Sequence, residues 1–149
     1  TVDLASVPFK WYPKDEILAH AAAWRLLDLS ESTGVPIDMI IATKFPCYFA
    51  RHPNKVAWLC HQYRAAYDLC GTMYSDFTHT EGDVGLRETL LRLDGEKLRE
   101  CRRVFTISRN TANRLEKFNG LAKPCDWKCA ADGVPRNHPS IAPSSFMPC

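Results

Sequence analysis

Two hydrophobic patterns alternate along the chain. Short, nearly continuous apolar runs have the length of strands that are buried on both faces, and longer segments repeat apolar residues at helical spacing. The short runs predict strands at residues 2–7, 37–43, 55–60 and 104–107. Because helical segments separate these runs, we expect right-handed crossovers and a parallel sheet with helices on both faces. The pattern therefore predicts an α/β fold.

The helical segments are recognised by one apolar face. Residues 14–29 place Ile17, Ala21 and Trp24 at helical spacing, and acidic residues occupy the first turn. Residues 84–103 form the longest helical stretch of the sequence. We expect five large side chains of these strands and helices to be buried: Trp24, Ile40, Trp58, Leu90 and Phe105.

Local signals mark the ends of the helices. Ser108 is a good N-cap for a helix over residues 109–118, and Gly120 stands where a C-terminal cap is expected. The pair Asp94-Gly95 is a candidate break within the longest helical stretch.

The last segment, residues 122–149, has a different composition from the rest. It holds five of the ten prolines and three of the seven cysteines, and its apolar residues follow neither a strand nor a helix period. We therefore expect one domain over residues 1–121 and an irregular tail over residues 122–149.

Length and composition bound the class of protein. A chain of 149 residues with 46% hydrophobic residues allows one globular domain, since domains cluster at roughly 100–150 residues. A net charge of +2 is too small to argue for nucleic-acid binding. No apolar run is long enough to span a bilayer, and the first residues lack the layout of a signal peptide. The odd number of cysteines then favours free thiols in a cytoplasmic protein.

Polar and basic residues follow three of the predicted strands. Carboxyl ends of parallel strands meet at one edge of a sheet, where ligands of doubly wound folds bind. The residues that follow strands 37–43, 55–60 and 104–107 include Lys44, His61, Gln62, Arg64, Ser108, Arg109 and Asn110. Guanidinium groups and backbone N–H groups match phosphate, so the sequence predicts a site for an anionic or polyhydroxylated ligand.

Each of these residues also has a structural interpretation. A lysine that closes a strand is commonly solvated, a histidine can be satisfied within the fold, and Ser108 fits a simple N-cap. A basic stretch is more often a solvated face than a binding patch. That stretch comprises Arg99, Arg102, Arg103, Arg109, Arg114 and Lys117.

The usual catalytic motifs are missing from the sequence. It has no dinucleotide-binding glycine motif, no P-loop, no nucleophile elbow and no H-E-x-x-H, so these enzyme classes lack support. Cys125, Cys129 and His138 have a spacing compatible with zinc, but no second complete pair follows. We expect no metal site.

Four short runs together carry a resemblance to a known family: ATKFP, RHPNKV, WLCHQ and ISRN. Over residues 2–120 the chain resembles the amino-terminal domain of bacterial glycosyltransferases of family 4. That family folds as two Rossmann-like domains facing each other across a cleft, the GT-B architecture. The resemblance implies retaining transfer of a hexosyl group from a nucleotide-sugar to a glycan or lipid-linked acceptor. It implies no metal and no cofactor beyond this co-substrate.

The resemblance also implies roles for residues at the strand ends. His61 matches a histidine that lines the family's cleft near the transferred sugar, so it is the expected catalytic residue. The run Ser108-Arg109-Asn110 resembles the polar junction that faces the same cleft. The other substrate-binding candidates on this predicted edge are Lys44, Gln62 and Arg64.

Departures from the family pattern limit the expected activity. The chain starts after the family's first strand and glycine-rich loop, and it holds no donor-binding domain with its glutamate pair. The tail resembles nothing in the family. We therefore expect a fragment that is inactive alone and that associates weakly, if at all, with a membrane surface. The alternative is a stand-alone glycan- or anion-binding module without catalysis. The oligomeric state stays open.

Overall fold

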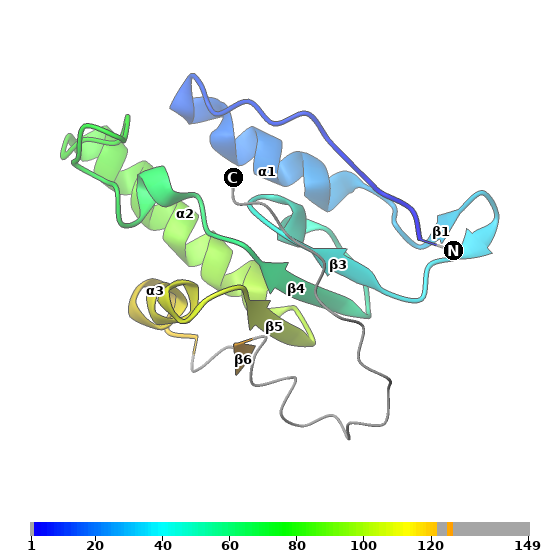
Figure 1. Cartoon of the computed structure of the whole chain (residues 1–149). Coiled ribbons are helices and arrows are strands. Elements are labelled where there is room, and N and C mark those ends of the chain that lie inside the picture. Colours follow the sequence, from blue (N-terminus) through cyan, green and yellow to red (C-terminus); the bar gives the residue numbers. More distant parts are fainter. Residues whose placement is uncertain (1, 122–124, 127–149) are drawn as a thin grey trace, which may run out of the picture.

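The computed structural model describes residues 2–121 and 125–126, which form a mixed α/β fold (Figure 1). Its helices are α1 (Ile17–Leu26), α2 (Glu81–Arg99) and α3 (Arg109–Asn119). Short 3-10 turns are η1 (Lys14–Glu16), η2 (Cys47–Phe49) and η3 (Arg64–Ala66). The strands are β1 (Glu31–Ser32), β2 (Val35–Pro36), β3 (Ile40–Ala42), β4 (Lys55–Leu59), β5 (Arg103–Thr106) and β6 (Cys125–Asp126).

A parallel sheet in the order β3-β4-β5-β6 forms the centre of the fold. Ala42 pairs with Ala57 across β3 and β4, and Trp58 pairs with Phe105 across β4 and β5. The prediction of a parallel α/β sheet from the runs 37–43, 55–60 and 104–107 is therefore confirmed. A separate hairpin joins β1 to β2 through Thr33 and Gly34, whose φ angles are +52° and +78°.

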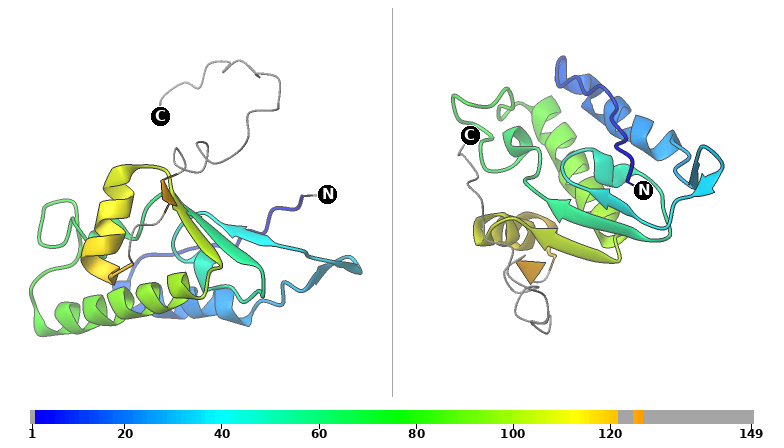
Figure 2. Two further views of the ribbon diagram at one scale, coloured as in Figure 1. Left: turned by 90° about the horizontal axis from the view of Figure 1, so that it is seen from below. Right: turned by 45° about the vertical axis from the view of Figure 1, so that its right-hand side comes forward.

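The described helices lie on one face of this sheet (Figure 2). Successive strands are added in one direction, so right-handed crossovers place every connecting helix on the same side. Ala57 and Leu59 of β4 point into that side and are fully buried, whereas Trp58 is 50% exposed. The expectations of helices on both faces and of a buried Trp58 are therefore wrong for the part of the chain that the structure describes. Successive side chains of β4 point to opposite faces of the sheet. Because nearly all of them are apolar, the sequence did not show which face is exposed.

Of the four remaining side chains predicted to be buried, two are buried and two are half-buried. Trp24 and Leu90 are buried, as expected, and Ile40 and Phe105 are half-buried. Residues 2–7, predicted to be a strand, form no helix or strand, and Val2 is 97% exposed. A strand requires a partner, and the apolar run alone could not supply one.

Helix boundaries agree closely with the prediction for α3 and differ by three or four residues for α1 and α2. The stretch predicted at residues 84–103 is helical over Glu81–Arg99. α1 ends at Leu26, three residues before the predicted end, and Leu27 turns to an extended conformation. α3 begins after Ser108 and ends at Asn119, and Gly120, with a φ of +60°, is the predicted C-terminal cap in the left-handed conformation.

α2 runs without a break through Asp94 and Gly95, which corrects the expectation of a break there. A Cβ on Gly95 would lie 3.7 Å from the side chain of Asn119. That distance is an ordinary van der Waals contact, and the nearest atom would be Nη1 of Arg99 at 3.0 Å, at the end of a flexible side chain of α2 itself.

The tail falls mostly outside the described residues. Its only described part is β6, whose Cys125 pairs with Phe105 in the sheet, so a short strand lies within the segment expected to be irregular. The prediction for the rest of residues 122–149, Cys129 and His138 included, lies outside the described residues. Within the described part, none of the helices combines the length and hydropathy of a membrane span.

Candidate functional site

The carboxyl ends of β3, β4 and β5 meet at one edge of the sheet. The amide of Cys60 donates to the carbonyl of Thr43 (2.9 Å), and that of Ile107 donates to Leu59 (3.3 Å). These bonds hold the segments that follow the three strands side by side. Lys44, His61 and Ser108 are therefore brought to one edge, as a parallel sheet requires.

The side chains at this edge remain separate. Lys44, His61 and Arg109 are exposed, and among the described residues no hydrogen bond joins any two of them. His61 places Nδ1 2.8 Å from the carbonyl oxygen of Gln62. That contact requires a proton on Nδ1, so the neutral ring leaves Nε2 as an acceptor.

Ser108 acts as the N-cap of α3. Its hydroxyl accepts a hydrogen bond from the amide of Thr111 (3.2 Å), and the Thr111 hydroxyl lies 3.3 Å from the carbonyl of Cys60. The cap thus ties the start of α3 to the end of β4. The structural interpretation of Ser108 holds whether or not a ligand lies above this helix end.

Gln62 and Arg64 face away from the open edge. Gln62 is fully buried, and its Oε1 accepts from Nε of Arg114 at 3.3 Å. Arg64 forms an ion pair with Asp68, with Nη2 2.7 Å from Oδ2. These two predicted substrate-binding residues therefore contact other side chains of the fold instead of lying beside His61.

Cys47 is a residue of this edge that the sequence did not reveal. Its sulfur lies 3.2 Å from the amide of Thr43 and 3.4 Å from that of Lys44, and it donates to the carbonyl of Lys44 at 2.8 Å. The thiol therefore fixes the backbone where β3 ends. The only sequence signal was the position of Cys47 directly after a Phe-Pro turn.

A basic hollow of about 540 Å³ adjoins the strand ends. It lies between the segment around η3, the first turns of α2, and α3. We call it the basic hollow because four of its lining side chains are His79, Arg87, Arg114 and Lys117. Among the predicted site residues only Asn110 lines it.

A paired carboxylate fixes one wall of the basic hollow. Asp68 accepts from Arg64 and lies 3.5 Å from Nη1 of Arg114. The hydrogen bond from Arg64 lowers the pKa of Asp68, and the charge of Arg114 adds to this effect. Asp68 therefore stays ionised and holds Arg114 in place.

The opposite wall is built around the ring of Phe118. The guanidinium of Arg87 lies 6.0 Å and the ammonium of Lys117 lies 5.1 Å from the centre of that ring. Arg87 also donates from Nε to the carbonyl of Ala66 at 2.7 Å, which fixes its position. His79 completes the rim, and Gly71 makes room for it, since a Cβ there would lie 2.6 Å from its Nε2.

The sequence could have revealed one wall of the basic hollow. Asn110, Asn113 and Lys117 recur at intervals of three and four residues, which places them on one face of a helix. Arg114 and Lys117 belong to the basic stretch for which a solvated face is the more common interpretation. The other walls come from segments distant in sequence, so no local pattern identified them.

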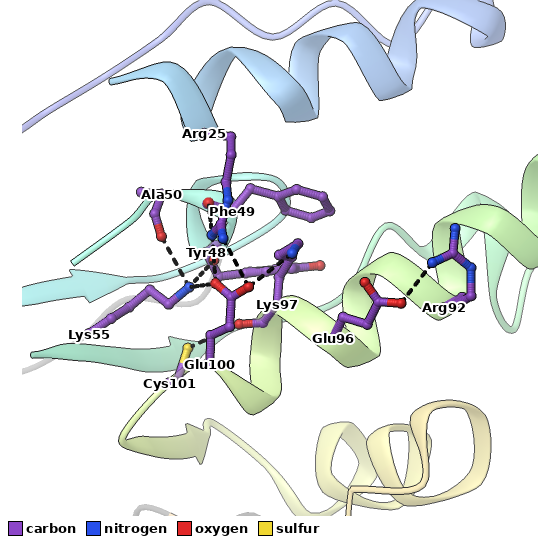
Figure 3. A network of polar contacts seen from close by, with 10 residues as sticks. All are labelled: Arg25, Tyr48, Phe49, Ala50, Lys55, Arg92, Glu96, Lys97, Glu100 and Cys101. Carbon is purple, nitrogen blue, oxygen red and sulfur yellow. Dashed lines mark hydrogen bonds and ion pairs between the residues drawn. The ribbon is translucent and has the colours of Figure 1, made fainter. Parts of the chain in front are cut away.

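A cluster of ion pairs around Glu100 lies at the other end of the sheet (Figure 3). Lys55 is 1% exposed, and its Nζ contacts the carbonyls of Tyr48 and Ala50 and the carboxylate of Glu100 at 2.8, 3.0 and 3.3 Å. Glu100 also accepts from Arg25 at 2.6 Å. This cluster joins α1 and β4 to the end of α2, and its three cations, Arg25, Lys55 and Lys97, share the carboxylate of Glu100. It has a structural role, since each of these cations has an acceptor within the fold.

Comparison of the chain with protein-family models, with curated proteins and with solved structures found no match.

Proposed function

We propose that this chain is the acceptor-side half of a retaining glycosyltransferase, with a Rossmann-like domain of the GT-B type. Two observations support the proposal: the sequence resemblance over residues 2–120, and a parallel sheet flanked by helices. The observation that carries it is the meeting of three strand ends, which brings Lys44, His61 and Ser108 to one edge. Ligands of parallel α/β sheets bind at such an edge.

His61 is the catalytic residue of the proposal. Its Nδ1 is held by the carbonyl of Gln62, so Nε2 is free to accept a hydrogen bond from a sugar hydroxyl. When the ring is protonated, Nε2 donates instead, as contact with a departing phosphate requires. The exposed charges of Lys44 and Arg109 at the same edge suit an anionic co-substrate.

In this proposal Gln62 and Arg64 are positioning residues and do not contact the substrate. Gln62 is buried beneath Arg114, and Arg64 is paired with Asp68, so both position neighbours of the site. The proposed co-substrate is a nucleotide-sugar, and the proposed acceptor is a glycan or lipid-linked sugar. The resemblance also implies a cytoplasmic location.

Nuclear magnetic resonance on the full chain tests the proposal. Methyl glycosides as acceptor analogues, and UDP-glucose or GDP-mannose as donors, should shift the amide resonances of Lys44, His61 and Arg109. His61→Ala should weaken binding of the nucleotide-sugars by about tenfold, the usual loss for a hydrogen bond to a charged partner, and binding of the neutral glycosides by less.

His52→Ala is the matched control, because His52 contacts the carbonyl of Ile37 near the other end of the sheet. It should leave the shifts unchanged. Equal effects of both histidine substitutions, or no shifts with any probe, would contradict the proposal.

The alternative is a stand-alone module that binds a glycan or an anion without catalysis. The observation in its favour is the basic hollow, which lies outside the set formed by Lys44 and His61. Binding that survives His61→Ala and maps to the basic hollow would favour this alternative.

A further inference from the structure

The basic hollow carries more positive than negative charge. Arg87, Arg114 and Lys117 line it together with one carboxylate, that of Asp68, which gives a formal charge of +2 with His79 neutral. Asp68 is also paired with Arg64. The positive charge of the hollow is therefore not balanced by the side chains that line it.

Several hydrogen-bond donors of the hollow are unused. Each nitrogen of Arg114 has one acceptor, which is Gln62 for Nε, Asp68 for Nη1 and Thr111 for Nη2. Arg87 donates only from Nε, to the carbonyl of Ala66, so neither of its Nη atoms has an acceptor among the described residues. Within the same residues, the ammonium of Lys117 contacts only the ring of Phe118.

Two amides extend this set of donors. Asn110 and Asn113 lie in the first turns of α3 and line the hollow, and neither side chain is hydrogen-bonded within the described residues. Asn110 lies at the positive end of the α3 dipole, whereas Lys117 lies in the last turn, about 10 Å further along the helix. Two cations and two amides that line the hollow from α2 and α3 thus have no acceptor among the described residues.

We propose that the basic hollow binds a small phosphomonoester, with its phosphoryl group between Arg87 and Lys117. A phosphoryl dianion matches the formal charge of +2, and guanidinium groups match its oxygens. The volume of about 540 Å³ is in the usual range for small-molecule sites. Val84 and Phe118 give the organic part an apolar wall. Binding of a phosphomonoester in the hollow is separate from the proposed sugar transfer, because it requires neither a second domain nor His61.

Titration calorimetry on the full chain tests this site with three probes. The probes are glycerol 3-phosphate, inorganic phosphate and glycerol, at constant ionic strength in chloride. We expect glycerol 3-phosphate to bind more tightly than inorganic phosphate, and glycerol not to bind. Binding of inorganic phosphate alone would overturn the assignment to a phosphomonoester.

Two substitutions locate the phosphoryl group. Arg87→Gln and Lys117→Gln should each weaken binding of glycerol 3-phosphate by about tenfold, because each removes a charge-assisted hydrogen bond. Arg92→Gln is the matched control on α2, since Arg92 is 62% exposed and paired with Glu96. It should change affinity by less than about twofold.

Lys117→Gln keeps the test decisive if Arg87→Gln disturbs the fold. Lys117 is exposed, and among the described residues its ammonium contacts only the ring of Phe118, so replacing it should not disturb the fold. Amide shifts at Asn110 and Asn113 in the wild-type chain would support the location. Wild-type affinity in Lys117→Gln, or the same affinity loss in Arg92→Gln, would overturn the proposal.

Discussion

At the scale of single residues, Asp94 is an acid enclosed within the core. It is fully buried, its Oδ2 accepts from the hydroxyl of Tyr67 at 2.7 Å, and its Oδ1 has no partner among the described residues. Burial raises the pKa of Asp94 to about 7, against the lowering effect of the Tyr67 and Tyr48 hydroxyls. The carboxyl group therefore holds its proton in the fold far more strongly than in the unfolded chain.

This raised pKa predicts that stability falls as pH rises from about 4 to about 7. Below the ordinary pKa of 3.8 both states keep the proton, and above it the unfolded chain releases it first. Each pH unit between the two pKa values then lowers the free energy of unfolding by about 1.4 kcal/mol. Asp94→Asn removes this loss, because an amide does not ionise.

Urea unfolding of the wild type and Asp94→Asn between pH 4 and pH 8 measures the effect. The stability advantage of the variant should grow from pH 4 and level off above pH 7. Asp3→Asn, at an exposed position, should follow the wild type. A constant difference between wild type and Asp94→Asn would show that Asp94 does not titrate in this range.

The contribution of Glu100 to the free energy of unfolding has the opposite dependence on pH from that of Asp94. Burial would raise its pKa, but hydrogen bonds from Arg25 and Lys97 and the charge of Lys55 lower it to about 2. Its contribution is thus present above the ordinary pKa of 4.5 and is lost as pH falls toward 2. Because the side chain is 35% exposed, solvent screening reduces this contribution to about 1–2 kcal/mol.

Glu100→Gln should therefore be less stable than the wild type at pH 6 and nearly as stable at pH 2. Thermal unfolding followed by circular dichroism across this range would measure the difference. Glu96→Gln is the control, because Glu96 is exposed and forms a single ion pair with Arg92. A Glu100→Gln deficit that persists at pH 2 would mean that its effect is not electrostatic.

At the scale of elements, the start of α3 depends on one hydroxyl. Ser108→Ala removes the acceptor of the Thr111 amide, which should destabilise the fold by about 1 kcal/mol. Ser108→Asp should restore most of this loss, since aspartate also caps helices. Chemical denaturation gives both values. Ser6→Ala, at an exposed position before α1, should have no effect, and a similar loss there would argue against the cap.

Elements with local signals were the predictable ones. The cap residues Ser108 and Gly120 bound α3 as the sequence indicated, because both signals act within one helical turn. The segment 2–7 and the side chain of Trp58 were predicted wrongly, because pairing and cover depend on distant segments. Local hydrophobicity could not distinguish a sheet covered on one face from a sheet covered on both.

Part of the candidate site could be predicted from the sequence, and part of it could not. The meeting of Lys44, His61 and Ser108 follows from parallel strands alone, so it could be foreseen. The burial of Gln62 and the basic hollow depend on how α2 and α3 pack together, as the contact between Gln62 and Arg114 shows. Contacts between side chains about fifty residues apart leave no periodic trace in the sequence.

At the scale of the whole molecule, the proposed function would make the described residues one wall of a glycosyltransferase cleft. Lys44, His61 and Arg109 are exposed along the edge of the sheet. Catalysis of sugar transfer requires the anomeric carbon to be held against the acceptor, and such positioning contributes roughly 7–11 kcal/mol. At an open edge, water also weakens each electrostatic contact.

We therefore predict that the 149-residue chain alone transfers no sugar from any donor. Purified chain would be incubated with a panel of nucleotide-sugars and with glycan or lipid acceptors, and products would be followed by mass spectrometry. Turnover that disappears in His61→Ala but persists in His52→Ala would show that one domain suffices, because water at the open edge would then not prevent catalysis. Binding at Lys44 and Arg109 without turnover is the expected outcome, since these exposed groups can attract an anionic donor but cannot hold its anomeric carbon against an acceptor.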